Sequence, residues 1–291
     1  MSSEVEIARP GLEGVIVGDT AICCVEQGQL LYRGYPISEL AEKTAFGEVA
    51  YLLIFGELPT ATQLKWFREQ LSEFHGLPPQ VLNTLRMIQS GVPMMSVLRT
   101  CISMASHFDP VEGQELDSLK RRAVWLLAVA SDIVAARYRL LNGKEPIKPQ
   151  TGVSHAHQML YSFHGTEPDE LSVRLLDMTL VLYAEHDFNA STFTNRVVAS
   201  TASDMTSATV SAIGALKGPL HGGANEEAIN LILRFKSAEE AGAWVNEALA
   251  NKEKIMGFGH RVYKHGDHRA VILEREMRKL AAVKGRQDLV A

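Results

Sequence analysis

Residues 117–141 constrain the fold of this chain more than any other stretch. Apolar side chains fall on most faces of this predicted helix between Ala123 and Ala136. A helix that is apolar nearly all round lies inside a large core or in a subunit interface. The only strand signals lie near the N-terminus. We therefore expect an all-α protein that is organised around this one helix.

Several further helices are predicted by spacing and by their end signals. Apolar residues recur at helical spacing after Pro36 until Gly56 stops the run. Thr60 with Gln63, and Ser237 with Glu240, have the spacing of capping boxes. The remaining helical segments are a helix that Pro93 opens and Asp109-Pro110 closes, a long helix from residue 166 toward residue 187, a small-residue helix at 200–216 and an amphipathic helix at 269–284.

The N-terminal region predicts a short β-hairpin. Residues 15–25 are rich in β-branched side chains, and residues 30–32 follow a Gln-Gly turn at Gln27 and Gly28. We read one or two short hairpins here.

Composition excludes several classes of function. A net charge of −5 does not favour binding to nucleic acid or anionic lipid. The longest apolar run, residues 123–130, is far too short to span a bilayer. No signal peptide is visible, and three cysteines are too few for a disulfide scaffold, so we expect a cytoplasmic protein.

The turn at residues 217–225 presents one histidine between two helices. His221 is bracketed by Gly218, Pro219, Gly222 and Gly223. Glycine allows a positive φ and close approach to a ligand. The positive end of a helix dipole disfavours imidazolium, so we expect a neutral ring that can donate a hydrogen bond. Taken alone, the stretch is equally compatible with a plain helix–helix turn.

Two more histidines lie at breaks in the helical pattern. His260 follows a Gly-Phe-Gly turn, and His186 ends an apolar helix. Three such histidines could polarise carbonyl oxygens or act as acid and base. A zinc-dependent hydrolase is the alternative, but Cys ligands and a His-Glu-x-x-His motif are absent, so we predict no metal.

Residues 252–269 carry five positive and two negative charges. Lysine and arginine beside glycine N–H groups suit a phosphate or carboxylate ligand, although a solvated loop has the same composition. No nucleophile motif is recognisable. The combination favours polarising the carbonyls of an anionic substrate over hydrolysis through a covalent intermediate.

At this point the residues resemble the citrate synthase family, and more closely the branch that includes 2-methylcitrate synthase. The resemblance covers nearly the whole chain. Its landmarks are Gly-Leu-Glu-Gly-Val at 11–15, Tyr-Arg-Gly-Tyr at 32–35, Gly-Glu-Leu-Pro-Thr at 56–60, Glu-His-Asp-Phe-Asn-Ala-Ser-Thr-Phe at 185–193, Lys-Gly-Pro-Leu-His-Gly-Gly-Ala-Asn at 217–225 and Gly-Phe-Gly-His-Arg-Val-Tyr at 257–263.

The resemblance implies a large helical domain over residues 1–221, with dimer-interface helices, and a smaller helical domain over residues 222–291 on the CoA-binding side. It implies a homodimer or higher homo-oligomer held by packed antiparallel helices. The implied reaction condenses acetyl-CoA or propionyl-CoA with oxaloacetate. The CoA thioester is a substrate, and no tightly bound cofactor is implied.

The resemblance also assigns roles by position. His221 would polarise the thioester carbonyl and stabilise the enol, and His260 would polarise and protonate the ketone of oxaloacetate. His186 and Arg269 would hold oxaloacetate. The CoA adenine would be wrapped by Lys254, Ile255, Met256, Gly257 and Phe258, and Lys264 would meet a CoA phosphate. Gly222 and Gly223 would form a hinge for closure that excludes water.

Three departures from the family pattern affect this reading. Asp267-His268-Arg269 replaces the usual Asp-Pro-Arg, and His75 stands where relatives commonly carry arginine. The family's catalytic base, an aspartate in an Asn-Val-Asp-Phe-Tyr-like motif, falls downstream of Ala291. We expect that the sequence omits a C-terminal part of about one fifth of a full-length member, because losing the last helices would expose apolar surface.

The alternative is a catalytically incomplete relative that assembles or binds CoA without the base. A protein that truly ended at Ala291 would show little synthase activity. The preference for acetyl-CoA or propionyl-CoA stays open.

Overall fold

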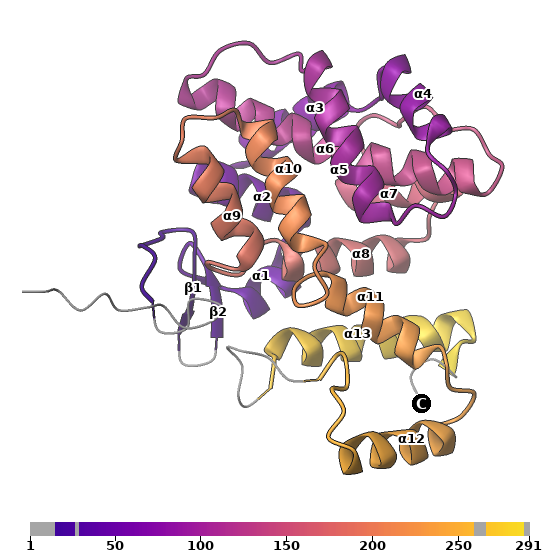
Figure 1. Cartoon of the computed structure of the whole chain (residues 1–291). Helices are drawn as coiled ribbons and strands as arrows, with labels where there is room; N and C mark the ends of the chain where they lie inside the picture. Colours follow the sequence, from indigo (N-terminus) through magenta and orange to yellow (C-terminus); the bar gives the residue numbers. More distant parts are fainter. Residues whose placement is uncertain (1–14, 27–28, 259–265, 288–291) are drawn as a thin grey trace, which may run out of the picture.

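The structure is a computed structural model that describes residues 15–26, 29–258 and 266–287. Within this part it is mainly helical, with one small sheet, as predicted (Figure 1). The helices are α1 (Ile37–Lys43), α2 (Phe46–Phe55), α3 (Ala61–Phe74), α4 (Pro79–Met87), α5 (Met94–Ala105), α6 (Leu116–Leu141), α7 (His155–His164), α8 (Glu170–Tyr183), α9 (Ala190–Ala199), α10 (Met205–Leu216), α11 (Gly223–Ile232), α12 (Ala238–Ala250) and α13 (His268–Lys284), with a 3-10 turn, η2, at Ser106–Phe108.

Helix α6 lies at the centre of the core, which confirms the prediction from its apolar pattern. It packs against α3, α5 and α7 (Figure 1). Val124, Ala128 and Ile133 are fully buried along it. Burial on several sides explains why apolar residues surround this helix instead of forming one stripe.

The predicted helix ends are largely confirmed. Thr60 Oγ1 accepts from the Gln63 N–H at 3.3 Å, and Gln63 Oε1 accepts from the Thr60 N–H at 2.7 Å. Ser237 Oγ caps α12 by accepting from the Glu240 N–H at 3.3 Å, but the Glu240 carboxylate accepts from the Lys236 N–H, so the reciprocal half of that capping box is not formed. Gly56 ends α2 with φ +102°, a conformation that glycine adopts without strain.

The single helical run expected between Pro36 and Gly56 is wrong, because it is two helices. The chain breaks at Thr44 and Ala45. The Glu48 carboxylate accepts from the Ala45 N–H at 2.7 Å and gives α2 its own start. Helices α4, α7 and α9 lie where no helix was predicted, and α10 begins at Met205 instead of residue 200, because Asp204 caps it.

The N-terminal sheet contains β1 (Cys23–Glu26), β2 (Gln29–Tyr32) and β3 (Tyr35–Pro36) in antiparallel order. The predicted hairpin is therefore present, and β3 extends it. Residues 15–22 were expected to be strand, but they are not, and Ile16 is almost fully exposed.

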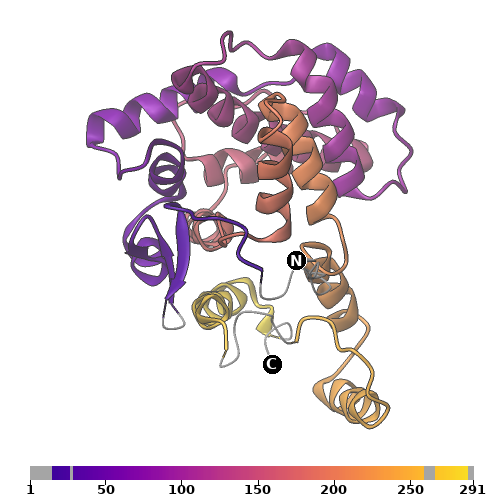
Figure 2. The same ribbon diagram turned by 60° about the vertical axis from the view of Figure 1, so that its left-hand side comes forward.

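Helices α11 and α12, called the outer helices below, extend away from the body formed by α1–α10. Figures 1 and 2 both show α12 as the helix furthest from that body. Helix α13 returns and packs against α8 and α1. Helices α9 and α10 pack along each other, as the small residues of α10 predict. The turn that carries His221 lies between the body and the outer helices.

Candidate active site

The turn at residues 217–225 joins α10 to α11, as expected. The N–H groups of His221 and Gly223 both donate to the Gly218 carbonyl, at 2.9 and 3.1 Å. A Cβ atom on Gly223 would lie 2.7 Å from the Lys217 carbonyl oxygen. Neither Gly222 nor Gly223 has a positive φ. Glycine is required here because backbone approaches backbone, and not because of a positive φ.

The His221 ring lies at the start of α9. Its Nε2 is 2.9 Å from Ser191 Oγ and accepts from the Ser191 N–H at 3.3 Å. Burial lowers the pKa of His221, so the ring is neutral. Because Nε2 accepts a backbone N–H, the ring proton resides on Nδ1, which can donate to a carbonyl oxygen. The neutral ring was expected from the helix that follows His221, but its contact is with the first turn of α9.

His186 lies in the loop between α8 and α9. Its backbone N–H donates to the Glu185 carboxylate at 2.9 Å. The next residue, Asp187, has φ +54°, which turns the chain sharply into α9. Asn189 then caps α9 by accepting from the Thr192 N–H at 2.9 Å. The loop is therefore fixed by local hydrogen bonds on both sides of His186.

Two buried residues of the N-terminal sheet form hydrogen bonds to the loop between α8 and α9. Tyr32 is fully buried, and its hydroxyl lies 2.9 Å from the Glu185 carbonyl and accepts from the Glu185 N–H at 3.2 Å. Cys23 Sγ accepts from the Asp187 N–H at 3.2 Å. Burial raises the pKa of the Cys23 thiol to about 12, so it stays protonated. Sequence reasoning assigned no role to either residue.

Arg269 lies in the first turn of α13, where it faces the end of α8. Its guanidinium is 6.0 Å from the ring centroid of Tyr183 and forms a bidentate ion pair with Asp267, with Nη2 at 2.7 Å. Asp267 also accepts from the Arg269 N–H at 2.9 Å and so caps the helix. His268 takes the first helical position, where the family commonly has proline, and α13 still starts there.

The segment 183–191 is contacted at its two ends by Arg269 and His221 and contains His186, but none of these three residues lines the cavity beside it. A cavity of about 350 Å³ opens beside this segment. Burial raises the pKa of Glu185, which lines the cavity. The lining comprises Thr20, Ile22, Glu185, Asp187, Phe188, Ser191, Thr192, Asn195, Arg196 and Ala212.

The predicted CoA-binding residues divide into two groups. Residues 254–258 form a turn after α12, where Gly257 has φ +94° and lies against Ala228 of α11. Phe258 is 76% exposed. His260 and Lys264 lie outside the described residues, so the grouping of His186, His221 and His260 around one substrate stays a prediction.

Two further observations concern the ranges 15–26, 29–258 and 266–287. Among these residues, no three His, Cys, Asp or Glu side chains gather as ligands for a metal ion. No helix in the described part combines the length and hydropathy that crossing a membrane requires.

The sequence matches the family described as "Citrate synthase, C-terminal domain" over residues 11–291. It is 41% identical to the 2-methylcitrate synthase of Mycobacterium tuberculosis, covering 96% of this chain and 71% of the relative. It is 40% identical to the citrate synthase of Deinococcus radiodurans, covering 96% of this chain and 74% of the relative.

Solved structures give the same result for the fold. The citrate synthase of Thermoplasma acidophilum, solved as a ternary complex with carboxymethyl coenzyme A and oxaloacetate, is 30% identical and superposes with a TM-score of 0.90. That match covers 96% of this chain and 74% of the other. The helical fold of this chain and the relatives that match it therefore agree on one class of protein, the citrate synthases. This chain belongs to the citrate synthase family.

Proposed function

We propose that this protein condenses an acyl-CoA, either acetyl-CoA or propionyl-CoA, with oxaloacetate to give citrate or 2-methylcitrate and CoA. The observation that carries the proposal is the His221 ring, which is neutral and accepts the Ser191 N–H at Nε2. Its Nδ1–H is thereby oriented as a donor. A neutral imidazole donor suits an acyl-CoA carbonyl that becomes an enol oxygen.

The remaining residues receive roles that fit this chemistry. His221 donates to the thioester carbonyl while the α-proton leaves to a general base. His260 donates to the ketone of oxaloacetate as the new carbon–carbon bond forms. Water then hydrolyses the thioester to release CoA. His186 and Arg269 hold oxaloacetate, with Arg269 on a carboxylate, and the contact of Arg269 with Tyr183, three residues before His186, supports this pairing.

CoA binding is assigned to the outer helices. Residues 254–258 would wrap the adenine through backbone groups, and Lys264 would meet a phosphate. The solved relative in complex with carboxymethyl coenzyme A and oxaloacetate supports both substrate classes. Residues 222–291 would close over the body about Gly222 and Gly223, and closure would exclude water from the enol.

The proposal includes a homodimer and a cytoplasmic location. Helices α9 and α10 pack as a pair and leave Val197 half-exposed, which suits an interface of packed helices. All three cysteines are free, which suits a reducing compartment.

The test is a CoA-thiol release assay on the intact protein with acetyl-CoA and propionyl-CoA, each with oxaloacetate. We expect turnover with at least one thioester, and His221→Gln should lower kcat by about 10²–10⁴-fold. His164→Gln is the matched control, because His164 is exposed on α7. Unchanged kcat in His221→Gln would reject the assignment. Thioester binding without turnover would favour the CoA-binding relative instead.

A further inference from the structure

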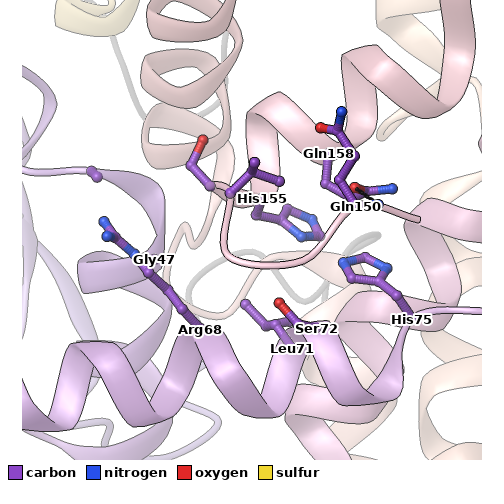
Figure 3. Close-up of a pocket in the computed structure, with 11 residues that line it drawn as sticks. Gly47, Arg68, Leu71, Ser72, His75, Gln150, His155 and Gln158 are labelled. Carbon is purple, nitrogen blue, oxygen red and sulfur yellow. Dashed lines mark hydrogen bonds between the residues drawn. The ribbon is translucent and has the colours of Figure 1, made fainter. Parts of the chain in front are cut away.

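A second, smaller cavity lies inside the body, between α2, α3 and α7 (Figure 3). Its volume is about 20 Å³, which is room for one or two particles of the size of water. It is lined by Ala45, Gly47, Arg68, Leu71, Ser72, His75, Gln150, Val153, Ser154, His155 and Gln158. None of these residues belongs to the candidate active site.

His155 is the unexplained group in this cavity. The residue is 7% exposed, and its Nδ1 has no hydrogen-bond partner. Its ring lies 5.5 Å from the Phe46 ring and 6.0 Å from the His75 ring, and Figure 3 shows the two imidazoles turned toward each other. Burial and the neighbouring His75 lower the pKa of His155 to about 3, so the ring is neutral. A buried polar atom without a partner is unfavourable, so an occupant that bonds to Nδ1 would stabilise the fold.

Two helices begin at the cavity, and at the start of α2 the Ala45 and Phe46 N–H groups already donate to Glu48 and Asp177. Ala45 and Gly47 come from the first turn of α2, and Ser154 and His155 from the first turn of α7. Helix N-termini present N–H groups and a positive dipole end, which favour an anion. No carboxylate lines the cavity.

The nearest acidic groups are already engaged. The Asp132 carboxylate accepts from His75 Nδ1 at 2.9 Å and from the Gly76 N–H at 2.6 Å. The Asp177 carboxylate accepts from the Phe46 N–H at 2.7 Å and interacts with Arg68, which extends away from the two imidazoles (Figure 3). His75, which stands where relatives commonly carry arginine, is thus paired with Asp132.

We propose that this cavity binds one chloride-sized inorganic anion, held by the His155 ring N–H and by the first turns of α2 and α7. The neutral His155 ring can place its proton on Nδ1, where it donates to the anion. The volume excludes larger oxyanions and metabolites. The anion links the starts of α2 and α7 and is independent of the proposed reaction.

Two measurements on the intact protein test this site. A crystal grown in bromide should show an anomalous peak in the cavity beside His155. Thermal unfolding in chloride should have a midpoint about 2–4 °C above that in gluconate at equal ionic strength, because an ion that binds only the folded state stabilises it.

The His155→Leu variant should lose the chloride-dependent shift, whereas His164→Gln should keep it. A bromide crystal that shows only a water in the cavity, together with equal midpoints in chloride and gluconate, would overturn the proposal. Should His155→Leu fail to fold, the two wild-type measurements decide the question without it.

Discussion

The body and the outer helices of this protein use apolar residues in opposite ways. Helix α6 buries fourteen of its 26 residues. Helix α11 buries none, and α12 buries only Ala248. Ile232, Leu233 and Leu249 are all more than half exposed on these two outer helices. Apolar side chains therefore stabilise the core of the body, whereas on the outer helices they stay exposed and can contact another surface.

This contrast bears on the proposed closure of residues 222–291. A region with few buried apolar contacts opens and moves at low free-energy cost. The body fixes His186 and His221 through hydrogen bonds to Glu185 and Ser191. A rigid half that positions polarising groups, beside a half that is loosely held, suits an enzyme that must admit and then enclose two substrates.

The strongest test of the contrast compares one substitution in each region. Ile133→Ala removes a fully buried side chain of α6 and should lower the unfolding free energy by about 2–5 kcal/mol. Leu233→Ala removes a side chain that is 65% exposed and should change it by less than about 0.5 kcal/mol. Urea unfolding of both variants measures this. Equal losses of unfolding free energy in the two variants would show that the body and the outer helices do not differ in how they use apolar side chains.

The junction between the regions should be sensitive to a single methyl group. Gly223→Ala places a Cβ 2.7 Å from the Lys217 carbonyl oxygen, and we expect a loss of about 1–3 kcal/mol. Gly242→Ala in α12 is the control, because a Cβ there meets nothing within 4 Å. That change should stabilise the helix by about 0.5–1 kcal/mol. A Gly223→Ala protein as stable as wild type would argue against the close approach.

Tyr32→Phe tests whether the sheet positions the His186 loop. Loss of the hydroxyl leaves the Glu185 N–H unpaired and should cost about 1–2 kcal/mol. Under the proposed function, Tyr32→Phe should also raise the KM for oxaloacetate by a larger factor than it lowers kcat. Tyr51→Phe is the control, because Tyr51 is equally internal and packs on Phe55 without a hydrogen-bonded hydroxyl among the described contacts. Identical behaviour of the two variants would remove this role from Tyr32.

The smallest expected effect is a pH dependence of the unfolding free energy that comes from His155 in the body. The pKa of His155 is about 3 in the fold against 6.5 for an ordinary histidine, so the unfolded chain binds an extra proton between these values. Stability is therefore full above pH 6.5 and is lost as the pH falls. Between pH 7 and 5.5 the loss is about 1 kcal/mol in gluconate buffer.

His155→Leu should remove this component, while His164→Gln, changed at an exposed site, should retain it. His75, Asp132 and Arg68 surround the ring, so the measurement is the difference between variant and wild-type curves of unfolding free energy against pH. A curve unchanged by His155→Leu would show that other groups carry the dependence.

Local signals in the sequence predicted much of the helical fold. The apolar faces of residues 117–141, the cap at Thr60 and the stop at Gly56 each depend on near neighbours in the chain, and each is confirmed. The break at Thr44 was missed because apolar spacing continues across it, and only the Glu48 side chain reveals the second start.

The support around the candidate site could not be predicted in this way. Tyr32 and Glu185 are 153 positions apart, and His221 and Ser191 are 30 apart. Such contacts follow from how the helices pack, so no short-range pattern signals them. The family resemblance named His186, His221 and Arg269 but not the groups that hold them in place.

The ion pair between Arg269 and Asp267 has a consequence for how a dicarboxylate would arrive. The guanidinium already has a carboxylate partner, with Nη2 2.7 Å from Asp267 Oδ2. Under the proposed function, an incoming substrate carboxylate would replace or share the Asp267 carboxylate, so association would be an exchange between two carboxylates. The gain in affinity is the difference between two similar ion pairs, which favours weak, readily reversible occupancy until the remaining groups of the site engage.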